Sequence, residues 1–156
     1  MTLPAIEGLG DPVRGTKIFA YRKGSATAPH AHNGMVSAHL VLDGRFHVRT
    51  FERLADEPEH LIIRPSLDME SGPGRTVSMS DERDNVHWFL ATSGHAYTLD
   101  IPLSAVYPGK QYVAPANRYG MIYLDPAGES LGNDRIRAPR LSFEQALARY
   151  GSSHVD

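Results

Sequence analysis

Two histidines with one residue between them are the part of this sequence that points most directly to chemistry. His30 and His32 follow Pro29 and precede a short turn. Side chains of an extended segment repeat every two residues, so both imidazoles point to the same face. Imidazole is a common ligand of Fe, Zn, Cu and Ni. The pair therefore predicts one half of a metal site.

A third ligand has to come from elsewhere, and His87 is the best candidate among the eight histidines. It stands within the apolar run Val86 to Ala91. A buried imidazole needs a polar partner, which either a metal ion or a backbone carbonyl would provide. Because the H-x-H pair is present, we favour the metal and predict a site made of His30, His32 and His87.

The elements that position these residues are predicted to be short strands. Fourteen glycines and eleven prolines are spread along the chain, and β-forming runs lie between turn signals. This pattern is typical of all-β sandwiches and barrels. Residues 24–29 are expected to form a loop that leads to His30, and residues 102–117 a second, long loop. Strands are predicted at residues 16–21, 35–42, 45–51, 60–64, 75–80, 86–91, 95–101 and 118–124.

The remaining segments complete the expected architecture. Residues 1–15 should form an irregular N-terminal arm, and residues 52–59 a charged connection. A C-terminal helix is predicted within residues 141–151, because Ser142 and Gln145 form a capping-box pattern and Gly151 is a stop signal. No helix separates the predicted strands, so we expect a single all-β domain over residues 1–156 rather than an α/β fold.

Composition excludes several classes of function. The chain has 156 residues, a net charge of −2 and no basic run, so we expect no binding of nucleic acid. It has no cysteine, which excludes disulfides, Cys-ligated zinc and a cysteine nucleophile. No apolar run approaches the ~18 residues of a membrane span. The N-terminal residues lack the features of a secretory signal, so we expect a cytoplasmic protein.

The order of these motifs resembles the cupin superfamily. The spacing of the first cupin motif, G-x5-H-x-H-x3-4-E-x6-G, is kept by Gly24, His30, His32, Ser37 and Gly44. Ser37 stands where the glutamate ligand of that motif would be, and of the second cupin motif only His87 is kept. The resemblance implies a jelly-roll β-barrel. A cupin that lacks the glutamate but keeps three histidines is similar to the three-histidine non-haem iron dioxygenases.

Within that group the chain resembles cysteamine dioxygenase and the plant cysteine oxidases. Their pattern carries H-x-H-P-G-M, a glycine nine residues later, N-x-H-x-F-x-A and then L-D. The matching positions within residues 29–101 are His30, His32, Gly34, Met35, Gly44, Asn85, His87, Phe89, Ala91, Leu99 and Asp100. The resemblance implies an iron centre and a small thiol substrate.

Three more side chains are candidates for catalytic roles beside the metal. His39 could be a fourth ligand, could bond to substrate, or could be a core histidine. Tyr97 could offer a hydroxyl to oxygen or substrate, or could simply pack. Asp100 matches the aspartate of the oxidase pattern and could orient a metal-bound histidine, or could form a hydrogen bond at a strand end.

We therefore expect a mononuclear Fe(II) dioxygenase that takes a small-molecule substrate and O2. Three neutral imidazoles leave coordination positions open, so a thiolate or enolate can bind the metal directly without a protein base. A lyase or isomerase with Zn, Ni or Mn is the first alternative. A cupin that binds a small molecule without catalysis is the second. The two-sided apolar strand 35–42 and Trp88 make a homodimer plausible.

Overall fold

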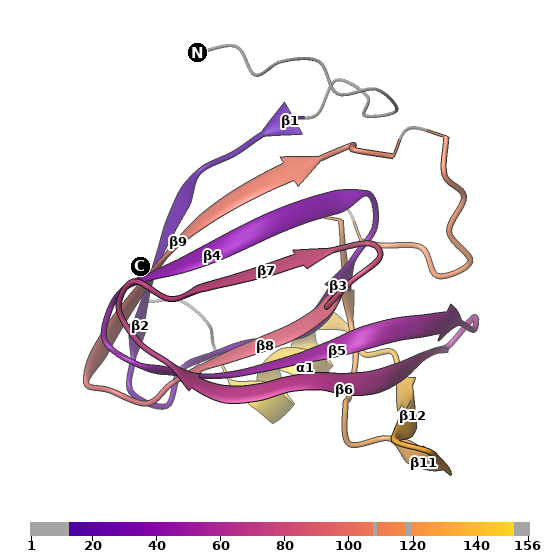
Figure 1. Cartoon of the computed structure of the whole chain (residues 1–156). Helices are drawn as coiled ribbons and strands as arrows, with labels where there is room; N and C mark the ends of the chain where they lie inside the picture. Colours follow the sequence, from indigo (N-terminus) through magenta and orange to yellow (C-terminus); the bar gives the residue numbers. More distant parts are fainter. Residues whose placement is uncertain (1–12, 108, 118–119, 152–156) are drawn as a thin grey trace.

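The computed structural model describes residues 13–107, 109–117 and 120–151 (Figure 1). This part of the chain forms two antiparallel sheets and one short helix, which confirms the all-β prediction. The smaller sheet contains β1 (Val13–Arg14), β2 (Lys17–Arg22), β4 (Met35–Asp43), β7 (Thr76–Ser80) and β9 (His95–Ser104). Its order is β1-β9-β4-β7, with β2 also paired to β9.

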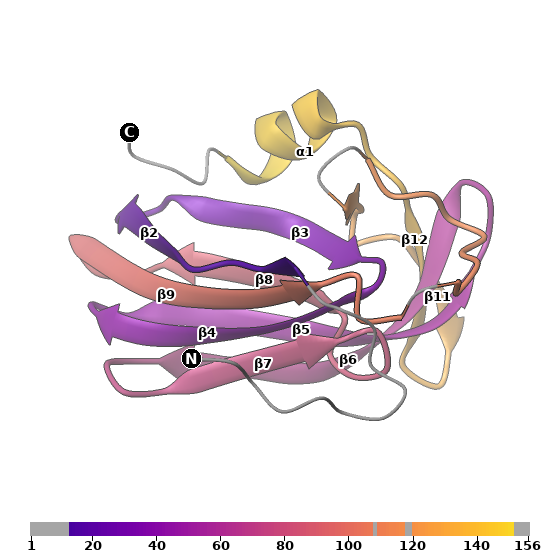
Figure 2. The ribbon, with the colours of Figure 1, turned by 90° about the horizontal axis from the view of Figure 1, so that it is seen from above.

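The larger sheet has the order β10-β3-β8-β5-β6-β12-β11. Its strands are β3 (Ala26–His32), β5 (Phe46–Asp56), β6 (His60–Ser71), β8 (Val86–Ala91), β10 (Met121–Tyr123), β11 (Glu129–Gly132) and β12 (Arg135–Pro139). One sheet lies over the other (Figure 2). Side chains of alternate residues fill the space between them, because successive residues of a strand point to opposite faces.

The core between the sheets is largely aromatic and β-branched. It contains Tyr21, Val41, Phe46, Val48, Val77, Met79, Phe89, Ala91 and Ala96. A second buried cluster includes Leu61, Ile63, Val86, Ile122 and Leu124. Phe89 of the first cluster lies beside His87 of β8, with ring centroids 6.1 Å apart, so the folding core and the candidate site share one interior.

The segment before the histidine pair differs from its prediction. Residues 24–29 were expected to be a loop, but Ala26–His32 is strand β3, paired with β8 and with β10. Pro29 lies where the register with β8 shifts, between Thr27 and His30. Proline has no N–H to donate, and a bulge is a position where a strand tolerates it.

A second proline led to a similar error. Strand 60–64 was predicted to end at Pro65, whereas β6 continues to Ser71. The ladder between β5 and β6 shifts register at Phe51, which faces Pro65, and this irregularity accommodates the proline. The charged connection predicted at residues 52–59 is also mostly strand, because β5 runs on to Asp56.

Predictions at the two ends of the domain were partly right. Of the irregular arm predicted at residues 1–15, Val13 and Arg14 pair with β9, and residues 1–12 lie outside the described part. The strand predicted at 118–124 is β10, Met121–Tyr123; residues 118 and 119 are not described. The hairpin of β11 and β12 was missed.

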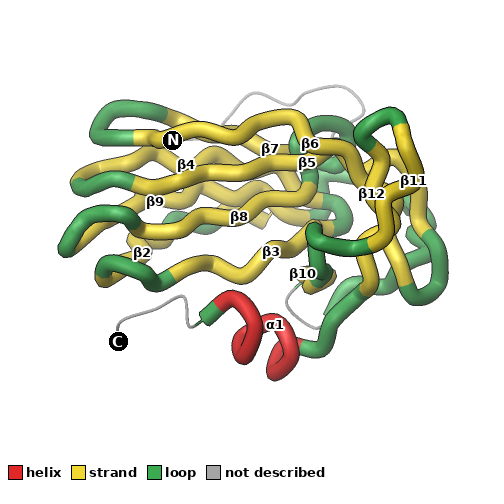
Figure 3. Tube along the Cα trace, turned by 90° about the horizontal axis from the view of Figure 1, so that it is seen from below, coloured by secondary structure: helices red, strands yellow, loops and turns green. Residues whose placement is uncertain are grey.

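The predicted C-terminal helix is confirmed as α1 (Phe143–Tyr150), which lies beside β3 (Figure 3). The backbone N–H of Gln145 donates to Ser142 Oγ over 3.2 Å, and the N–H of Ser142 donates to Gln145 Oε1 over 2.8 Å. Tyr150 at the other end donates to buried Asp125 over 2.6 Å, which fixes the helix to the barrel. In the described part of the chain no helix has the length and apolar character that a membrane crossing requires.

Candidate metal centre

Strand pairing in the larger sheet brings the three predicted ligands together. His30 of β3 stands directly opposite His87 of β8. His32 follows on the same face of β3, because side chains repeat every two residues. On the other side of β3, Tyr123 of β10 is paired with His30. Residues that are 57 positions apart in the sequence, 30 and 87, thus become cross-strand neighbours.

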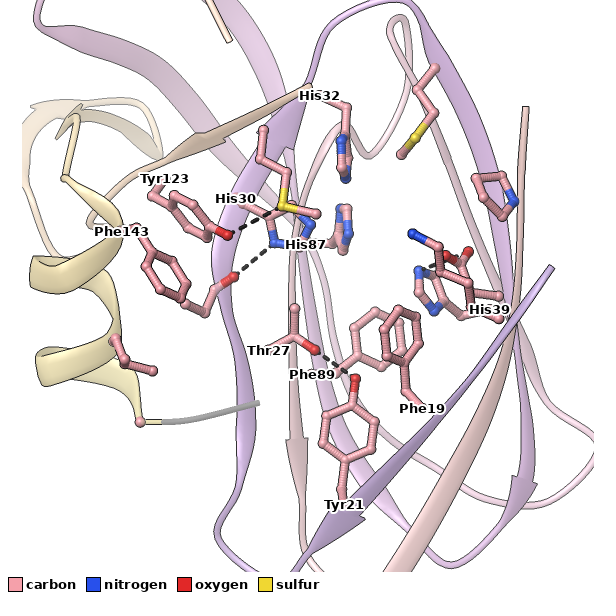
Figure 4. A pocket seen from close by; sticks show the side chains of 18 of the residues that line it. Phe19, Tyr21, Thr27, His30, His32, His39, His87, Phe89, Tyr123 and Phe143 are labelled. Atoms are coloured by element: carbon pink, nitrogen blue, oxygen red, sulfur yellow. Dashed lines mark hydrogen bonds and ion pairs between the residues drawn. The ribbon is translucent and has the colours of Figure 1, made fainter. Parts of the chain in front are cut away.

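The three imidazoles form a compact buried cluster (Figure 4). Each of His30, His32 and His87 has a nitrogen that lies within 4.8 Å of a nitrogen of the other two. Their exposed fractions are 3%, 5% and 1%. The ring centroids of His30 and His87 are 4.2 Å apart, and those of His30 and His32 are 4.7 Å apart.

The tautomer of each ring is set by the backbone. His30 Nδ1 lies 2.8 Å from the carbonyl oxygen of Ala28, His32 Nδ1 3.2 Å from that of Gly120, and His87 Nδ1 3.2 Å from that of Asn85. A carbonyl oxygen only accepts, so each Nδ1 must donate. The proton therefore sits on Nδ1, and Nε2 keeps the lone pair that binds a metal.

Electrostatics keeps these rings neutral. Burial is the largest cause that lowers the pKa of His30, from 6.5 to about 4. Burial, and then the neighbouring histidines, lower the pKa values of His32 and His87 well below the usual value. Metal binding requires deprotonated imidazole. The donor set thus fits a metal ion, with three Nε2 atoms available in one place.

A side-chain clamp holds the backbone at His32. Asn85 Nδ2 donates to the carbonyl of His32 over 3.0 Å, and the N–H of His32 donates back to Asn85 Oδ1 over 3.3 Å. Arg53 Nη1 also donates to that carbonyl, over 3.1 Å, and its guanidinium is paired with Asp56 at 2.7 Å. Since the carbonyl of Asn85 accepts from His87, one residue positions two of the three rings.

The clamp was not predicted as part of the site. Asn85 had been singled out as a motif match two residues before His87, and that position was the available signal. Arg53 carries no such signal in the sequence. It comes close to His32 only because β5 pairs with β8 and because β5 has a bulge next to Arg53.

His39 and Asp100 form a second polar group on the facing sheet. They are cross-strand partners on β4 and β9, and His39 Nε2 lies 3.4 Å from Asp100 Oδ1. Ser37 Oγ donates a hydrogen bond to the same carboxylate oxygen. Burial lowers the pKa of His39, and the Asp100 carboxylate opposes that shift.

This arrangement decides between the roles that the sequence left open for His39 and Asp100. The ring centroid of His39 is 5.8 Å from that of His87, and His39 does not belong to the group of nitrogens within 4.8 Å of one another. Ser37, at the position of the cupin glutamate, is bonded to Asp100 rather than directed at the three histidines. The geometry therefore places His39 and Asp100 beside a three-nitrogen site, as groups that can contact a substrate.

A cavity of about 260 Å³ connects the three-histidine cluster with the His39–Asp100 pair. Its wall is mainly apolar and aromatic, with contributions from Phe19, Phe89, Met121, Tyr123, Phe143 and Leu147. Among the described residues of the lining, Lys17 and Asp100 are the only lysine, arginine or carboxylate side chains. Such a cavity suits a small molecule with a short apolar body.

The structure places Tyr97 away from this cavity. It is 37% exposed, between buried Ala96 and Thr98 on β9, so its side chain points to the opposite face of the sheet from Asp100. The predicted catalytic hydroxyl is not supported at this position. Two other tyrosines line the cavity instead, Tyr21 and Tyr123.

The buried Tyr21 hydroxyl lies 2.7 Å from Thr27 Oγ1, and burial raises its pKa to about 12, so it stays protonated. Tyr123 donates to Met121 Sδ over 3.2 Å. Tyr21 belongs to β2, a strand that was predicted with nearly the same bounds. Which face of β2 points inward depends on its pairing with β9, and the sequence did not predict that pairing.

Comparisons with known proteins show the fold alone. No protein-family model and no curated protein matches the chain. Among solved structures, it is similar to RmlC from Streptococcus suis, with 14% identity and a TM-score of 0.50 over 76% of this chain and 55% of that one. It is also similar to procruciferin, an 11S globulin from Brassica napus (16%, TM-score 0.48, 60% and 21%), and to an oxalate oxidase (13%, TM-score 0.44, 67% and 57%).

The chain spans between 21% and 57% of the length of these three structures. Together with the two antiparallel sheets, the likeness identifies the fold as a cupin-type jelly roll, as the sequence motifs predicted. Three buried histidines inside that fold could hold a metal ion.

Proposed function

On the premise of this cupin-type fold, we propose that the chain is a mononuclear non-haem Fe(II) dioxygenase. It acts on a small thiol or enolisable substrate that binds the metal directly. The observation that carries the proposal is the donor set: three buried, neutral imidazoles, each with its Nδ1 bonded to a carbonyl and its Nε2 available. No carboxylate belongs to this group of described residues.

The neutral ligand set decides which substrates fit. Bound Fe(II) would supply a Lewis-acidic 2+ charge that favours an anionic substrate group, together with the redox chemistry that O2 requires. His30, His32 and His87 add no negative charge that would oppose such a group. The apolar wall excludes water and holds the body of the substrate beside the reacting centre.

The His39–Asp100 pair gives the cavity its own polar contact. His39 lies on the sheet that faces the cluster, and the hydrogen bond from Ser37 fixes the carboxylate that orients it. It can therefore hydrogen-bond a substrate oxygen or sulfur opposite the metal.

The proposal is tested by oxygen consumption of the Fe(II)-reconstituted protein on thiols and β-diketones. We expect stoichiometric O2 uptake with at least one of these classes in the wild type and in His95→Ala, an exposed histidine outside the cavity. His87→Ala should have none. Wild-type protein that binds Fe(II) and these compounds, but consumes no O2 with any of them, would contradict the dioxygenase assignment.

One observation favours a second function. A histidine bonded to a buried carboxylate is a suitable acid–base pair, so the His39–Asp100 pair fits a metal-dependent lyase or isomerase with Zn, Ni or Mn. Turnover under strict anaerobiosis separates the two. A dioxygenase stops without O2, whereas a lyase or isomerase continues.

A further inference from the structure

We propose that Lys17 makes this cavity selective for one class of substrate. At the end remote from the metal, a substrate of this class carries a negative charge and no ammonium group. This inference rests on the proposed function, because it assumes that the other end of the substrate lies at the three histidines. It specifies the substrate class of the same site.

Lys17 stands where the cavity meets solvent. It is the first residue of β2, its side chain is exposed, and it is among the residues that line the cavity. In the sheet it is paired with Asp100, so its side chain lies on the cavity face of β2.

Asp100 is the one carboxylate among the described residues that line the cavity, and two neighbours engage its Oδ1. Asp100 accepts a hydrogen bond from Ser37 and is paired with His39. Within the described part of the chain no carboxylate forms an ion pair with Lys17. A substrate ammonium at the remote end would therefore lie beside the like charge of Lys17, which is unfavourable, whereas an anionic group there would pair with it.

The wall between the two ends is apolar. Phe19, Met35 and Met121 lie along it, and Phe89 borders His39 with ring centroids 4.9 Å apart. A short hydrocarbon segment is what such a wall accepts. The substrate inferred from the cavity has a thiolate or enolate head, an apolar body and an anionic tail.

This class differs from that implied by the sequence resemblance. Cysteine and cysteamine both carry an ammonium group close to the sulfur. The arrangement of Lys17 and the engaged Asp100 disfavours that group, so the cavity selects against the substrates of the proteins whose motifs it shares.

Three thiols of matched length test the inference: 3-mercaptopropionate, 1-propanethiol and cysteamine. Their tails are anionic, neutral and cationic. Binding to Co(II)-loaded protein is measured under argon by calorimetry, so that no turnover is needed. We expect the tightest binding for 3-mercaptopropionate and the weakest for cysteamine, with about two- to fivefold between successive thiols, as for a partly exposed ion pair.

The variant Lys17→Met should lower the affinity for 3-mercaptopropionate to that for propanethiol. Lys23→Met, which removes an exposed lysine outside the cavity, is the matched control and should keep the wild-type order. The preference should also weaken as salt screens the ion pair.

Two results would overturn the inference while leaving the proposed function intact. In the first, cysteamine binds as tightly as 3-mercaptopropionate. In the second, Lys17→Met keeps the preference for the anionic thiol. Failure of the wild-type protein to take up metal would instead overturn both, and the metal content of the sample identifies that case.

Discussion

At the scale of single residues, the backbone carbonyls decide the chemistry of the candidate site. Each imidazole has a protonated Nδ1 because a carbonyl oxygen lies next to it, and Asn85 supplies one of those carbonyls while its side chain holds the peptide of His32. Such partners of metal-bound histidines orient the rings and affect metal affinity strongly. Asn85 is therefore a positioning residue that contacts no substrate.

Replacing Asn85 by Ala should lower metal affinity about 10- to 100-fold, which is typical of such supporting contacts. The side chain loses its bonds to both polar groups of the His32 peptide, so the ring of His32 is less well placed. Co(II) titration measures the change, with Asn133→Gly as the control in an exposed turn. An unchanged affinity in a folded variant would show that Asn85 does not position His32.

The metal-free protein should lose stability in acid. The unfolded chain protonates His30 near pH 6.5, whereas the folded chain does so near pH 4, so unfolding takes up a proton between these values. The contribution of His30 to the free energy of unfolding is thus complete above pH 6.5 and is lost as the pH falls to about 4. The loss from His30 alone is on the order of 3 kcal/mol.

Urea unfolding at pH 7, 5.5 and 4 measures this slope. His30→Gln removes the titrating group and should show a flatter dependence. The same slope in the variant and the wild type would mean that His30 is not the group responsible.

The three candidate ligands were predictable because each lies in a local sequence motif that marks it. His30 and His32 are a strand pair, and His87 stands in an apolar run, so residue types and spacing were enough. The positions of Tyr97 and Tyr21 were not, because the inward face of β9 and of β2 depends on which strands they pair with.

At the scale of elements, turns and bulges determine where the strands can run. Pro29 and Pro65 read as strand breakers, yet both lie in strands at shifts of register. Long-range pairing decides whether a proline ends a strand, and a single sequence does not contain that information. The turn at Gly44 was predictable, since a glycine after aspartate between two β runs is a strong local signal.

Gly44 should be among the least replaceable glycines of the fold. Its φ is 75°, and a Cβ at this position would lie 2.3 Å from the carbonyl oxygen of His95. Gly44→Ala should therefore destabilise the protein by about 2 kcal/mol or more, through backbone strain and steric overlap. Gly94→Ala is the matched control, because a Cβ there meets no heavy atom within 4 Å.

Urea denaturation compares the two glycine variants. We expect a much larger loss of unfolding free energy for Gly44→Ala than for Gly94→Ala. Equal, small effects would show that the turn can relax around a side chain.

At the scale of the whole molecule, the outer face of the smaller sheet carries an apolar row. Ile18, Leu99 and Leu40 are cross-strand neighbours on β2, β9 and β4, and Ile18 and Ile101 are 65% and 47% exposed. Contiguous apolar surface of this kind marks interaction sites. We propose that a second copy of the chain covers this face.

Trp88 is not part of that proposal. It lies on the face of β8 opposite to His87 and Phe89, and it is covered within the same chain. The guanidinium of Arg49 lies 5.3 Å from its ring centroid, and the ring of Tyr150 in α1 also lies 5.3 Å away.

A charge in the apolar row should disrupt the dimer. Ile101→Lys is expected to sediment as a monomer at concentrations where the wild type is dimeric. Leu54→Lys, a substitution at a 42% exposed leucine on the larger sheet, should remain dimeric. A monomeric wild type, or a dimeric Ile101→Lys, would contradict the proposed interface.

The central claim is that His30, His32 and His87 hold one metal ion. Metal content after anaerobic reconstitution with Fe(II) and removal of loosely bound metal tests it most directly. We predict one iron per chain in the wild type and in the surface control His95→Ala, and well below one in His87→Ala and His87→Gln, with folding checked by circular dichroism. A wild-type protein that retains no metal, or a folded His87 variant that retains a full equivalent, would contradict the claim.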